Sequence, residues 1–284
     1  MATDLIAGAS GYLGRHMVGE LSSRGYQTRA LIRDPDKRDL VAGAEEIVVL
    51  DLLEPGDRLE QAMEGVDIVF SAAGQPCTLQ RIRDRKSFSG VDYPINRNLL
   101  ESALRHGVRK FAYVTVLAPR QMREDAYVAA HERFVEELSA SGIEYAVVRA
   151  NGFFYSYLDL LDVTRRGLAI SFCDGKARSN PIHEADLAVA CVEAIEGEER
   201  DVAVGGPEVI TRREEIEIAF AAVDRKPRVL RIPRPLLRIG LAPFRLRDPR
   251  RAEMVDFLAN LSSVDVLAPR HGRRTLRSYL DEHV

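Results

Sequence analysis

The first two-thirds of the chain alternate short apolar runs with stretches in which apolar residues recur at helical spacing. The apolar runs are rich in Val, Ile and Ala and are mostly continuous, which is typical of strands buried on both faces of a parallel sheet. They predict strands over residues 3–8, 27–32, 46–50, 67–73, 109–115 and 144–149. Helices are predicted over residues 12–24, 93–106 and 127–141, since glycine follows each stretch where a helix should end. This repetition predicts an α/β fold, a doubly wound parallel sheet with right-handed crossovers.

The last third of the chain differs from the first two-thirds in composition and in the pattern of its apolar residues. Residues 151–170 are rich in aromatic side chains, while a helix over 184–196 and a short strand over 202–204 are predicted to return to the sheet. We therefore expect a smaller, partly helical C-terminal region. The stretch 225–251 holds ten Lys and Arg, one acid (Asp248) and five prolines. It is interpreted either as a docking surface for an acidic partner or a membrane surface, or as a solvated surface whose Arg stems cover apolar groups.

Composition and charge narrow the class of protein. The 284 residues are 46% hydrophobic and 29% charged, and their net charge of −3 argues against a nucleic-acid-binding polycation. The cysteines (77, 173 and 191) lie far apart and the six histidines lack metal-ligand spacing, so neither disulfides nor a metal site is predicted. No apolar run approaches the roughly 20 residues that span a bilayer. The N-terminus does not read as a signal peptide, which makes the cytoplasm the predicted location.

The strongest local signal is a glycine-rich turn between the first predicted strand and the first predicted helix. It reads GASGYLG over residues 8–14, so its glycines are spaced as GxxGxxG. Glycine permits a tight turn, small residues let the backbone approach a pyrophosphate, and the helix N-terminus offers N–H groups to the phosphate oxygens. In this strand-to-helix context the turn predicts a Rossmann-type dinucleotide site.

The loop after the second strand bears on the choice of cofactor. A protein selective for NAD(H) usually places Asp or Glu there to hold the ribose 2′-hydroxyl, whereas this chain has Arg33, followed by Lys37 and Arg38. A guanidinium can fork onto a 2′-phosphate, so NADP(H) is favoured over NAD(H). Asp34 and Asp36 leave open the alternative of a solvated loop of mixed charge.

Two further loops are predicted to meet the cofactor at the same edge of the sheet. Asp51 and Leu52 follow the third strand, where a side chain and a backbone amide can meet adenine. Ala72, Ala73 and Gly74 follow the fourth, where small residues would line the cofactor's ribose. Each signal is weak alone, but each follows the carboxyl end of a strand, where ligands bind in such sheets.

Several segments together resemble the atypical short-chain dehydrogenase/reductases, in the NmrA-like and isoflavone-reductase-like NAD(P)H-binding branch. They are GASGYLGRHMV, ALIRDPDK, VDYPINRNLLESALRHGVRKFAYVTV, HERFVEELSASGIEYAVVRANGFF, PIHEADLAVACVEAI, GGPEVITRREEIEIAF and VLAPRHGRRTLRSYL. The branch holds reductases, redox sensors and respiratory-complex subunits. The resemblance therefore implies the fold and the cofactor more sharply than the activity.

The resemblance also implies roles for individual residues. Those implied to hold the cofactor are Gly8, Ser10, Gly11, Tyr12, Leu13, Gly14 and Arg33. It implies that Asn151 and Phe153 lie in a loop beside the nicotinamide, and that residues 181–186 start a helix on the substrate side, with helix capping and an exposed face as the alternative. The chain is divided accordingly into an NAD(P)-binding domain over 1–150, to which about 184–205 return, and a smaller substrate-side region over 151–284.

Catalysis in this superfamily usually relies on Ser or Thr, Tyr and Lys. Here Thr115 ends the fifth strand, and Tyr127 is followed four residues later by His131, where lysine is usual. Residues four apart share a helix face, so both can reach one pocket. A His with its ordinary pKa is mostly neutral at pH 7 and lowers a phenol's pKa less than an ammonium does, which favours reduction over alcohol oxidation. Alternatively His131 is itself the acid, or both residues have only packing or surface roles.

Three hypotheses follow. The first is an NADP(H)-dependent oxidoreductase, working as a reductase on a small carbonyl or unsaturated compound. The second is a non-catalytic NAD(P)H-binding sensor or assembly factor, suggested by the missing lysine and by the basic stretch 225–251. The third is an epimerase or dehydratase that uses its bound cofactor transiently.

Overall fold

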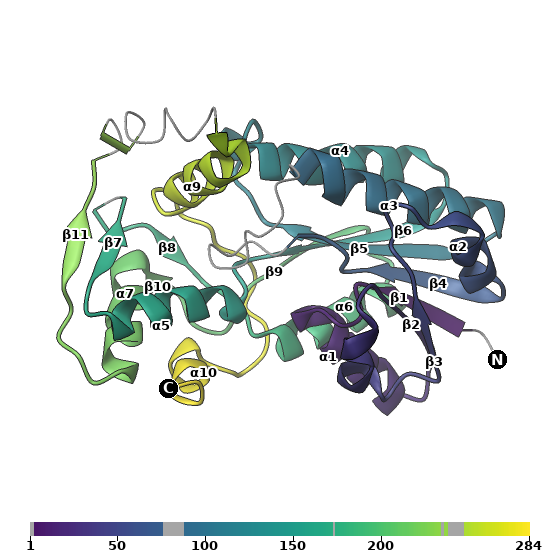
Figure 1. The fold of residues 1–284 in the computed structure, drawn as a ribbon, viewed down its shortest axis with the longest axis horizontal. Helices are drawn as coiled ribbons and strands as arrows, with labels where there is room; N and C mark the ends of the chain where they lie inside the picture. The colour runs from purple at the N-terminus through teal and green to yellow at the C-terminus, as the bar shows by residue number, and fades with distance from the viewer. Residues whose placement is uncertain (1–2, 76–87, 173, 234–235, 238–246) are drawn as a thin grey trace.

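The computed structural model describes residues 3–75, 88–172, 174–233, 236–237 and 247–284. Its centre is a seven-stranded parallel sheet in the order β3-β2-β1-β4-β5-β6-β9 (Figure 1). The strands are β1 (Thr3–Ala7), β2 (Gln27–Ile32), β3 (Glu46–Val49), β4 (Val66–Ser71), β5 (Lys110–Val116), β6 (Glu144–Ala150) and β9 (Asp201–Val204). The predicted Rossmann-type α/β fold is confirmed, and each of the six strands predicted before residue 150 is present.

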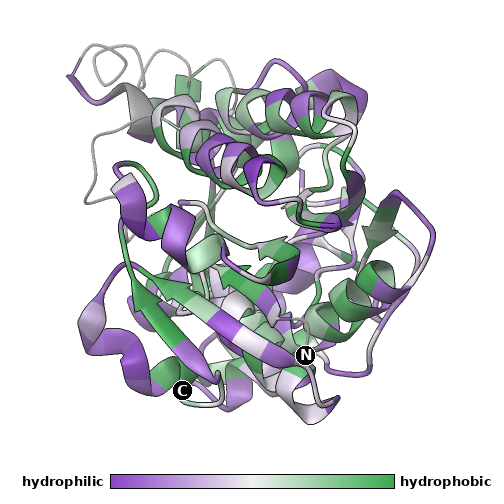
Figure 2. Cartoon of the chain, turned by 90° about the vertical axis from the view of Figure 1, so that its right-hand side faces the viewer, coloured by the Kyte–Doolittle hydropathy of each residue, from purple (hydrophilic) through white to green (hydrophobic). Residues whose placement is uncertain are grey.

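Helices cover both faces of this sheet. One face is covered by α1 (Tyr12–Ser23) and α6 (Glu184–Glu196), and the other by α2 (Gly56–Met63), α3 (Phe88–Arg105) and α4 (Ala126–Ala140). Successive side chains of a strand point to opposite faces, so strands in this position need apolar residues at nearly every position. Figure 2 shows these mostly hydrophobic strands between helices that carry polar residues on their outer sides.

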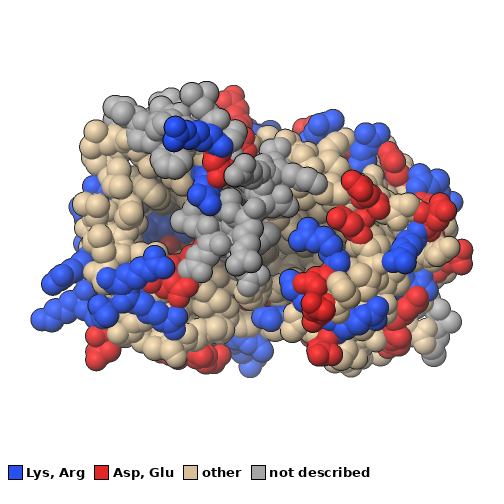
Figure 3. Space-filling view, viewed as in Figure 1, with Lys and Arg blue, Asp and Glu red and all other residues tan. Residues whose placement is uncertain are grey.

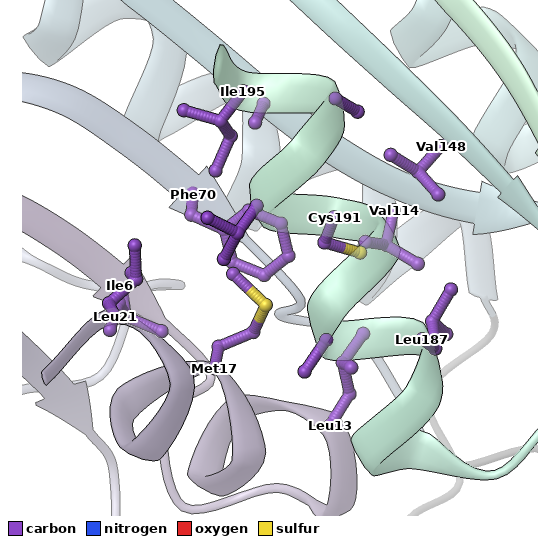
Figure 4. Packing of buried hydrophobic residues seen from close by; sticks show 14 of the residues in the cluster. Ile6, Leu13, Met17, Leu21, Phe70, Val114, Val148, Leu187, Cys191 and Ile195 are labelled. Atoms are coloured by element: carbon purple, nitrogen blue, oxygen red, sulfur yellow. The ribbon is translucent and has the colours of Figure 1, made fainter. Parts of the chain in front are cut away.

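The face under α1 and α6 shows how the layers are joined. Met17 of α1 packs with Leu187 and Cys191 of α6 over Phe70 of β4 and Val114 of β5 (Figure 4). Burying one such apolar side chain typically stabilises a fold by about 1.5–3 kcal/mol. Because α6 follows residue 150, its packing on α1 fixes the late part of the chain to the first crossover.

One predicted helix is longer than expected. The pattern placed its start at residue 93, but α3 begins five residues earlier and contains Pro94. Proline removes a backbone donor and normally disfavours a helix interior. The preceding turn is kept because Phe88 and Val91 are buried, a tertiary contribution that local propensity does not contain.

The strand order reverses between β1 and β4, which are neighbours in the sheet. In open α/β sheets a ligand binds outside the carboxyl ends of the strands at this point. Beyond those ends lies the C-terminal region (Figure 1). Its elements are α5 (Tyr157–Arg165), β7 (Ala169–Ser171), β8 (Arg178–Ser179), β10 (Ile210–Thr211), α7 (Arg212–Ala222), β11 (Val229–Arg231), α9 (Pro249–Leu261) and α10 (Leu276–Asp281).

Candidate functional site: a dinucleotide crevice

The glycine turn brings the end of β1 against the end of β4. Gly8 has a φ of +74°, and a β-carbon there would lie 2.8 Å from the carbonyl oxygen of Ala72. A β-carbon at Gly14 would overlap the carbonyl oxygen of Gly8. Any larger residue at either position would push the helix away from the two strands. The glycines therefore create the close backbone approach that a pyrophosphate site needs.

The N-terminus of α1 lies at the carboxyl ends of β1 and β4, the switch point of the sheet, which is called the crevice from here on. Gly11 is the N-cap and donates its own N–H to the Gly8 carbonyl at 2.9 Å, which closes the turn. The first turn of α1 carries no acidic side chain, so no local carboxylate opposes an anion at the positive end of the helix dipole. The predicted residues Ser10, Tyr12 and Leu13 lie in this turn and in the first turn of α1.

An aromatic pair spans the crevice from α1 to the C-terminal region. The rings of Tyr12 and Tyr155 are stacked, with centroids 4.5 Å apart and planes within 4°. The Arg15 guanidinium lies 4.9 Å from the Tyr12 ring centroid. Tyr155 was not predicted as part of the site, although it belongs to an aromatic run that begins at Phe153.

The loop after β2 places a free guanidinium at the crevice edge. Arg33 is exposed and forms no ion pair within the described part of the chain. Asp34 caps the 3₁₀ helix η1 (Pro35–Val41) by accepting from the Asp36 N–H at 3.1 Å, and it lies 3.9 Å from Lys37. The Asp34 carboxylate is thus engaged within its own turn. This arrangement suits the predicted pairing of Arg33 with a 2′-phosphate.

Buried polar residues of α3 hold the loops that follow β3 and β4. Asn96 accepts from the Ser71 hydroxyl at 2.5 Å and donates to the Ala73 carbonyl at 3.1 Å. Asn98 donates to the Leu52 carbonyl at 2.8 Å, and Asp51 accepts from the Leu53 N–H.

A second carboxylate on α3 holds the end of the β4 loop. The Asp92 side chain accepts the Gln75 N–H at 2.6 Å and lies next to Gly74. Asp92, Asn96 and Asn98 were not predicted, because they share α3 with other polar residues such as Arg97 and Glu101, so the sequence alone does not distinguish them.

Two of the three predicted catalytic residues are brought together, and a residue that was not predicted joins them. The rings of Tyr127 and His131 lie edge to face at 4.6 Å. His131 Nδ1 lies 2.6 Å from the Tyr113 hydroxyl, deep between α4 and β5. His131 is only 6% exposed, so it is not a surface residue, and burial lowers its pKa to about 4. A tyrosine inside a buried strand needs a polar partner, which was the available signal for Tyr113.

Polar atoms near this pair lack a partner. Thr115 lies two residues after Tyr113 on β5 and therefore on the same face. Its hydroxyl, like His131 Nε2, is buried without a hydrogen-bond partner among the described residues. Unpaired buried polar atoms cost free energy that a bound polar group would recover. Together with the glycine cradle, these atoms fit the hydroxyl-rich dinucleotide that the sequence predicts.

Asn151 performs a structural task in the loop after β6. Its amide donates to Asn180 Oδ1 and to the Val266 carbonyl, both at 2.8 Å, and its oxygen accepts the Gly152 N–H. The predicted neighbour Phe153 pairs with Ile182 across a short bridge. The Asn151 amide thus donates both of its bonds within the protein, and the side chain holds the loop after β6 in place.

The segment 181–186 caps the start of α6, as one interpretation predicted, but the exposed face that this interpretation included is wrong, because Ile182, Glu184 and Asp186 are buried. His183 is the N-cap and accepts the Ala185 N–H at 3.0 Å. Asp186 accepts the backbone N–H groups of Arg273 and Arg274 and pairs with the Arg274 guanidinium. This carboxylate therefore fastens the chain before α10 beside the crevice.

A buried polar cluster borders the crevice on the C-terminal side. Glu215 Oε1 accepts from Ser179 at 2.6 Å, from Tyr157 at 2.9 Å and from Arg212 at 2.8 Å. Arg212 reaches on to the Leu261 carbonyl, where α9 ends. The cluster joins α5, β8, α7 and α9 around the loop that contains Gly152. It was not predicted, because its members lie far apart in sequence.

A doubly wound sheet with a glycine turn at its switch point defines a dinucleotide-binding protein. Residues 8–198 match the model of a family described as NAD(P)H-binding. The chain belongs to this NAD(P)H-binding family, which confirms the family expected from its motifs.

Curated relatives include reductases and an assembly factor. The chain is 27% identical over 254 residues to divinyl chlorophyllide a 8-vinyl-reductase of Arabidopsis thaliana, covering 81% of this chain and 59% of that protein. It thus spans about three fifths of that relative's length. It is 29% identical to the ceramide reductase of Caulobacter vibrioides, covering 83% of this chain and 76% of the relative. It is 24% identical to the photosystem II assembly factor Ycf39 of Trieres chinensis, with coverages of 83% and 73%.

Solved structures share the whole fold. The NADPH-dependent quinone oxidoreductase QOR2 of Escherichia coli, complexed with NADPH, superposes with a TM-score of 0.74. The match covers 99% of each chain at 20% identity, so the likeness is one of fold. The C-terminal region is therefore part of the shared architecture.

The remaining features concern membrane crossing and the cysteines. In the ranges that the structure describes, none of the helices has the length and apolar character needed to span a bilayer. Cys191 is free and buried, while Cys77 and Cys173 lie outside the described residues. The cytoplasmic location stays a prediction.

Proposed function

We propose that the protein is an NADPH-dependent reductase of a small carbonyl or unsaturated compound. The observation that carries the proposal is the position of the Tyr127–His131 pair. It lies on the helix that follows β5, and β5 is separated from the glycine turn of β1 only by β4. Residues 1–150, with 184–205, would hold the cofactor, and the remaining C-terminal residues would form the substrate side.

Each part of the crevice has a distinct partner in the cofactor. The backbone of residues 8–14 would hold the diphosphate, while Arg33 and Lys37 would meet the 2′-phosphate that distinguishes NADPH. The loops at Asp51–Leu52 and at 72–74 would receive the adenine and its neighbouring ribose. Residues 151–153 would border the nicotinamide through their backbone, since the Asn151 amide is already engaged.

The residues around Tyr127 would manage the proton. When bound, a reduced nicotinamide supplies a hydride equivalent, and the protein must supply a proton. Tyr127 is a neutral phenol that donates it, and His131 positions this phenol by an edge-to-face contact. Because burial keeps His131 neutral, His131 adds no positive charge that would stabilise the Tyr127 phenolate, which would be the base in the oxidation direction. The arrangement therefore suits reduction.

The apolar surroundings of Tyr127 bear on the substrate class. Tyr127 packs with Phe88 and Phe257, in a cluster that also contains Met122 and Met254. The named substrates of the two reductase relatives, a chlorophyllide and a ceramide, also carry large apolar parts. We therefore propose a carbonyl or alkene on an apolar skeleton.

The test is NADPH oxidation with a panel of hydrophobic aldehydes, ketones and activated alkenes. We expect turnover with at least one member, and a loss of about 100-fold in kcat for Tyr127→Phe, within the range of general acid catalysis. Tyr26→Phe is the matched control, because Tyr26 lies at the opposite end of the sheet, where its hydroxyl bonds Glu196. Unchanged turnover in Tyr127→Phe would remove this residue from the mechanism.

A non-catalytic NAD(P)H-binding function is the second candidate. It is favoured by the histidine in place of lysine and by the 24% identity to an assembly factor. In that case NADPH would bind with the same dependence on Arg33, but no compound in the panel would be reduced. Binding without turnover thus distinguishes the two candidates.

A further inference from the structure

A solvent-exposed apolar patch lies at the end of the molecule opposite the chain's N-terminus (Figure 1). There β7 and β11 form a two-stranded parallel sheet in which Ile170 is opposite Leu230. These side chains are 48% and 51% exposed, and their neighbours Leu168 and Val229 are exposed as well. Three of the ten large hydrophobic residues exposed in the described ranges therefore lie on this small sheet, and a fourth, Leu168, directly precedes it. Contiguous exposed apolar surface of this kind marks interaction sites.

Cations surround the patch. Arg166 stands in the turn before Leu168, and the approach to β11 and its end carry further basic residues. These are Arg225, Lys226, Arg228 and Arg231, and none of them forms an ion pair within the described part of the chain. Figure 3 shows Lys and Arg projecting from this end of the molecule, whereas acidic and basic groups alternate at the other end. Asp224 is the one acid between residues 217 and 248.

We propose that this patch, formed by Leu168, Ile170 and Leu230 with Arg166, Lys226 and Arg228, docks on an anionic lipid surface. Aliphatic side chains enter the boundary between headgroups and acyl chains, and flanking cations pair with phosphates. Arg228 lies two residues before Leu230, so the two side chains point to the same face of the extended chain. The charge and the apolar surface thus point the same way.

Two other occupants fit the patch less well. In a symmetric contact with a second copy, the unpaired cations of both chains would be brought together. A specific acidic protein would be expected to meet aromatic anchors in shaped pockets, whereas the exposed apolar groups named here are aliphatic and lie on and beside two short strands. A lipid surface requires charge and apolar area without shape complementarity.

The chain offers a direct optical test because it contains no tryptophan. Leu230→Trp introduces a single reporter within the patch, and Leu104→Trp is its control on α3, at a position 45% exposed. Vesicles of phosphatidylcholine with phosphatidylglycerol should shift the Leu230→Trp emission to the blue, whereas pure phosphatidylcholine should not. High salt should weaken the effect, since exposed charges are screened. No shift with anionic vesicles, or an equal shift in both variants, overturns the proposal.

Charge reversal tests the cations in the otherwise unmodified chain. Lys226→Glu/Arg228→Glu should lower co-sedimentation with anionic vesicles by about tenfold or more, because several counter-ion contacts are lost together. Arg120→Glu/Arg123→Glu makes the same change in net charge at two exposed positions beside η2 (Arg120–Met122) and should leave sedimentation unchanged. Equal losses in both pairs would overturn the assignment to this patch.

Two further outcomes would assign the patch to another partner. The wild-type chain is tested with soluble polyglutamate and, separately, by sedimentation velocity over a range of concentrations. Binding to polyglutamate without vesicle binding would indicate an acidic protein. Self-association that Ile170→Ser abolishes would indicate a second copy, and either result replaces the lipid proposal.

Discussion

Tyr113 on β5 and His131 on α4 share a 2.6 Å hydrogen bond between the phenol oxygen and ring Nδ1, in a place closed to solvent. Burial lowers the pKa of His131 to about 4 and raises the pKa of Tyr113 well above its usual value. Both side chains are therefore neutral at pH 7. Where related enzymes usually carry a lysine ammonium, this chain has a neutral ring that is anchored to the sheet.

This relationship predicts a pH-dependent stability. A histidine whose pKa falls from 6.5 to about 4 on folding stabilises the folded state above pH 6.5 and loses that contribution as the pH falls towards 4. At pH 5 the lost contribution is about 2 kcal/mol. Urea unfolding at pH 7.5 and 5.0 should show that His131→Gln is less sensitive to acid than the wild-type chain.

His183 is expected to make a second, separate contribution, because its pKa is also lowered to about 4, first by burial and then by the nearby Arg274. His183→Gln should remove a separate share of the acid sensitivity, so the double variant should be the least sensitive. Asp4 acts in the opposite direction, because burial raises its pKa to about 6. Equal acid sensitivity in the wild-type chain and His131→Gln would contradict the assigned burial of a neutral ring.

The glycine turn predicts opposite effects for two substitutions in one helix. Gly14→Ala places a methyl group against the Gly8 carbonyl and should cost about 1–3 kcal/mol of stability, together with cofactor affinity. Gly19→Ala, one to two turns later, meets nothing within 4 Å and should stabilise α1 by about 0.4–1 kcal/mol. Thermal unfolding and NADPH titration check both; a tolerated Gly14→Ala would show that α1 approaches the Gly8 carbonyl less closely than described.

The proposed role of Arg33 at the 2′-phosphate predicts that its loss affects the binding of NADPH but not of NADH. Arg33→Ala should weaken NADPH binding by about 1.5–3 kcal/mol, the range for hydrogen bonds to a charged group, and leave NADH binding unchanged. Calorimetric titration with each coenzyme measures this difference. Arg123→Ala is the control for a lost exposed charge, since Arg123 lies beyond η2 rather than after β2. Equal loss for both coenzymes would place Arg33 elsewhere than at the 2′-phosphate.

The Asp186 carboxylate predicts a local effect on the chain before α10. Burial opposes its ionisation, but hydrogen bonds from Arg274 and Arg273 outweigh it and hold the pKa of Asp186 below its usual value. Asp186→Ala leaves these groups unpaired and should cost about 1–3 kcal/mol. Limited proteolysis should then cut residues 265–275 faster. Asp201→Ala removes an exposed partner of Arg149 and serves as the control, which should keep the wild-type cleavage rate.

Local features of the sequence determined the sheet, the crossover helices and the dinucleotide turn. Buried parallel strands require continuous apolar runs, and a strand-to-helix turn around a diphosphate requires glycine at fixed positions, so both requirements appear in neighbouring residues. Tyr127 and His131 are one helical turn apart, and their contact could likewise be predicted from spacing alone.

Tertiary structure decided which distant residues became partners. The spacing of His131 did not reveal that Tyr113, 18 residues earlier, would bind its ring. Asn151 bonds the Val266 carbonyl across 115 residues, and Tyr12 stacks on Tyr155. Such pairs depend on how whole layers pack. Packing determines how deeply each side chain is buried, which shifts its pKa, and which groups lie within hydrogen-bond distance. A sequence pattern fixes which face a residue occupies, whereas packing fixes what that face meets.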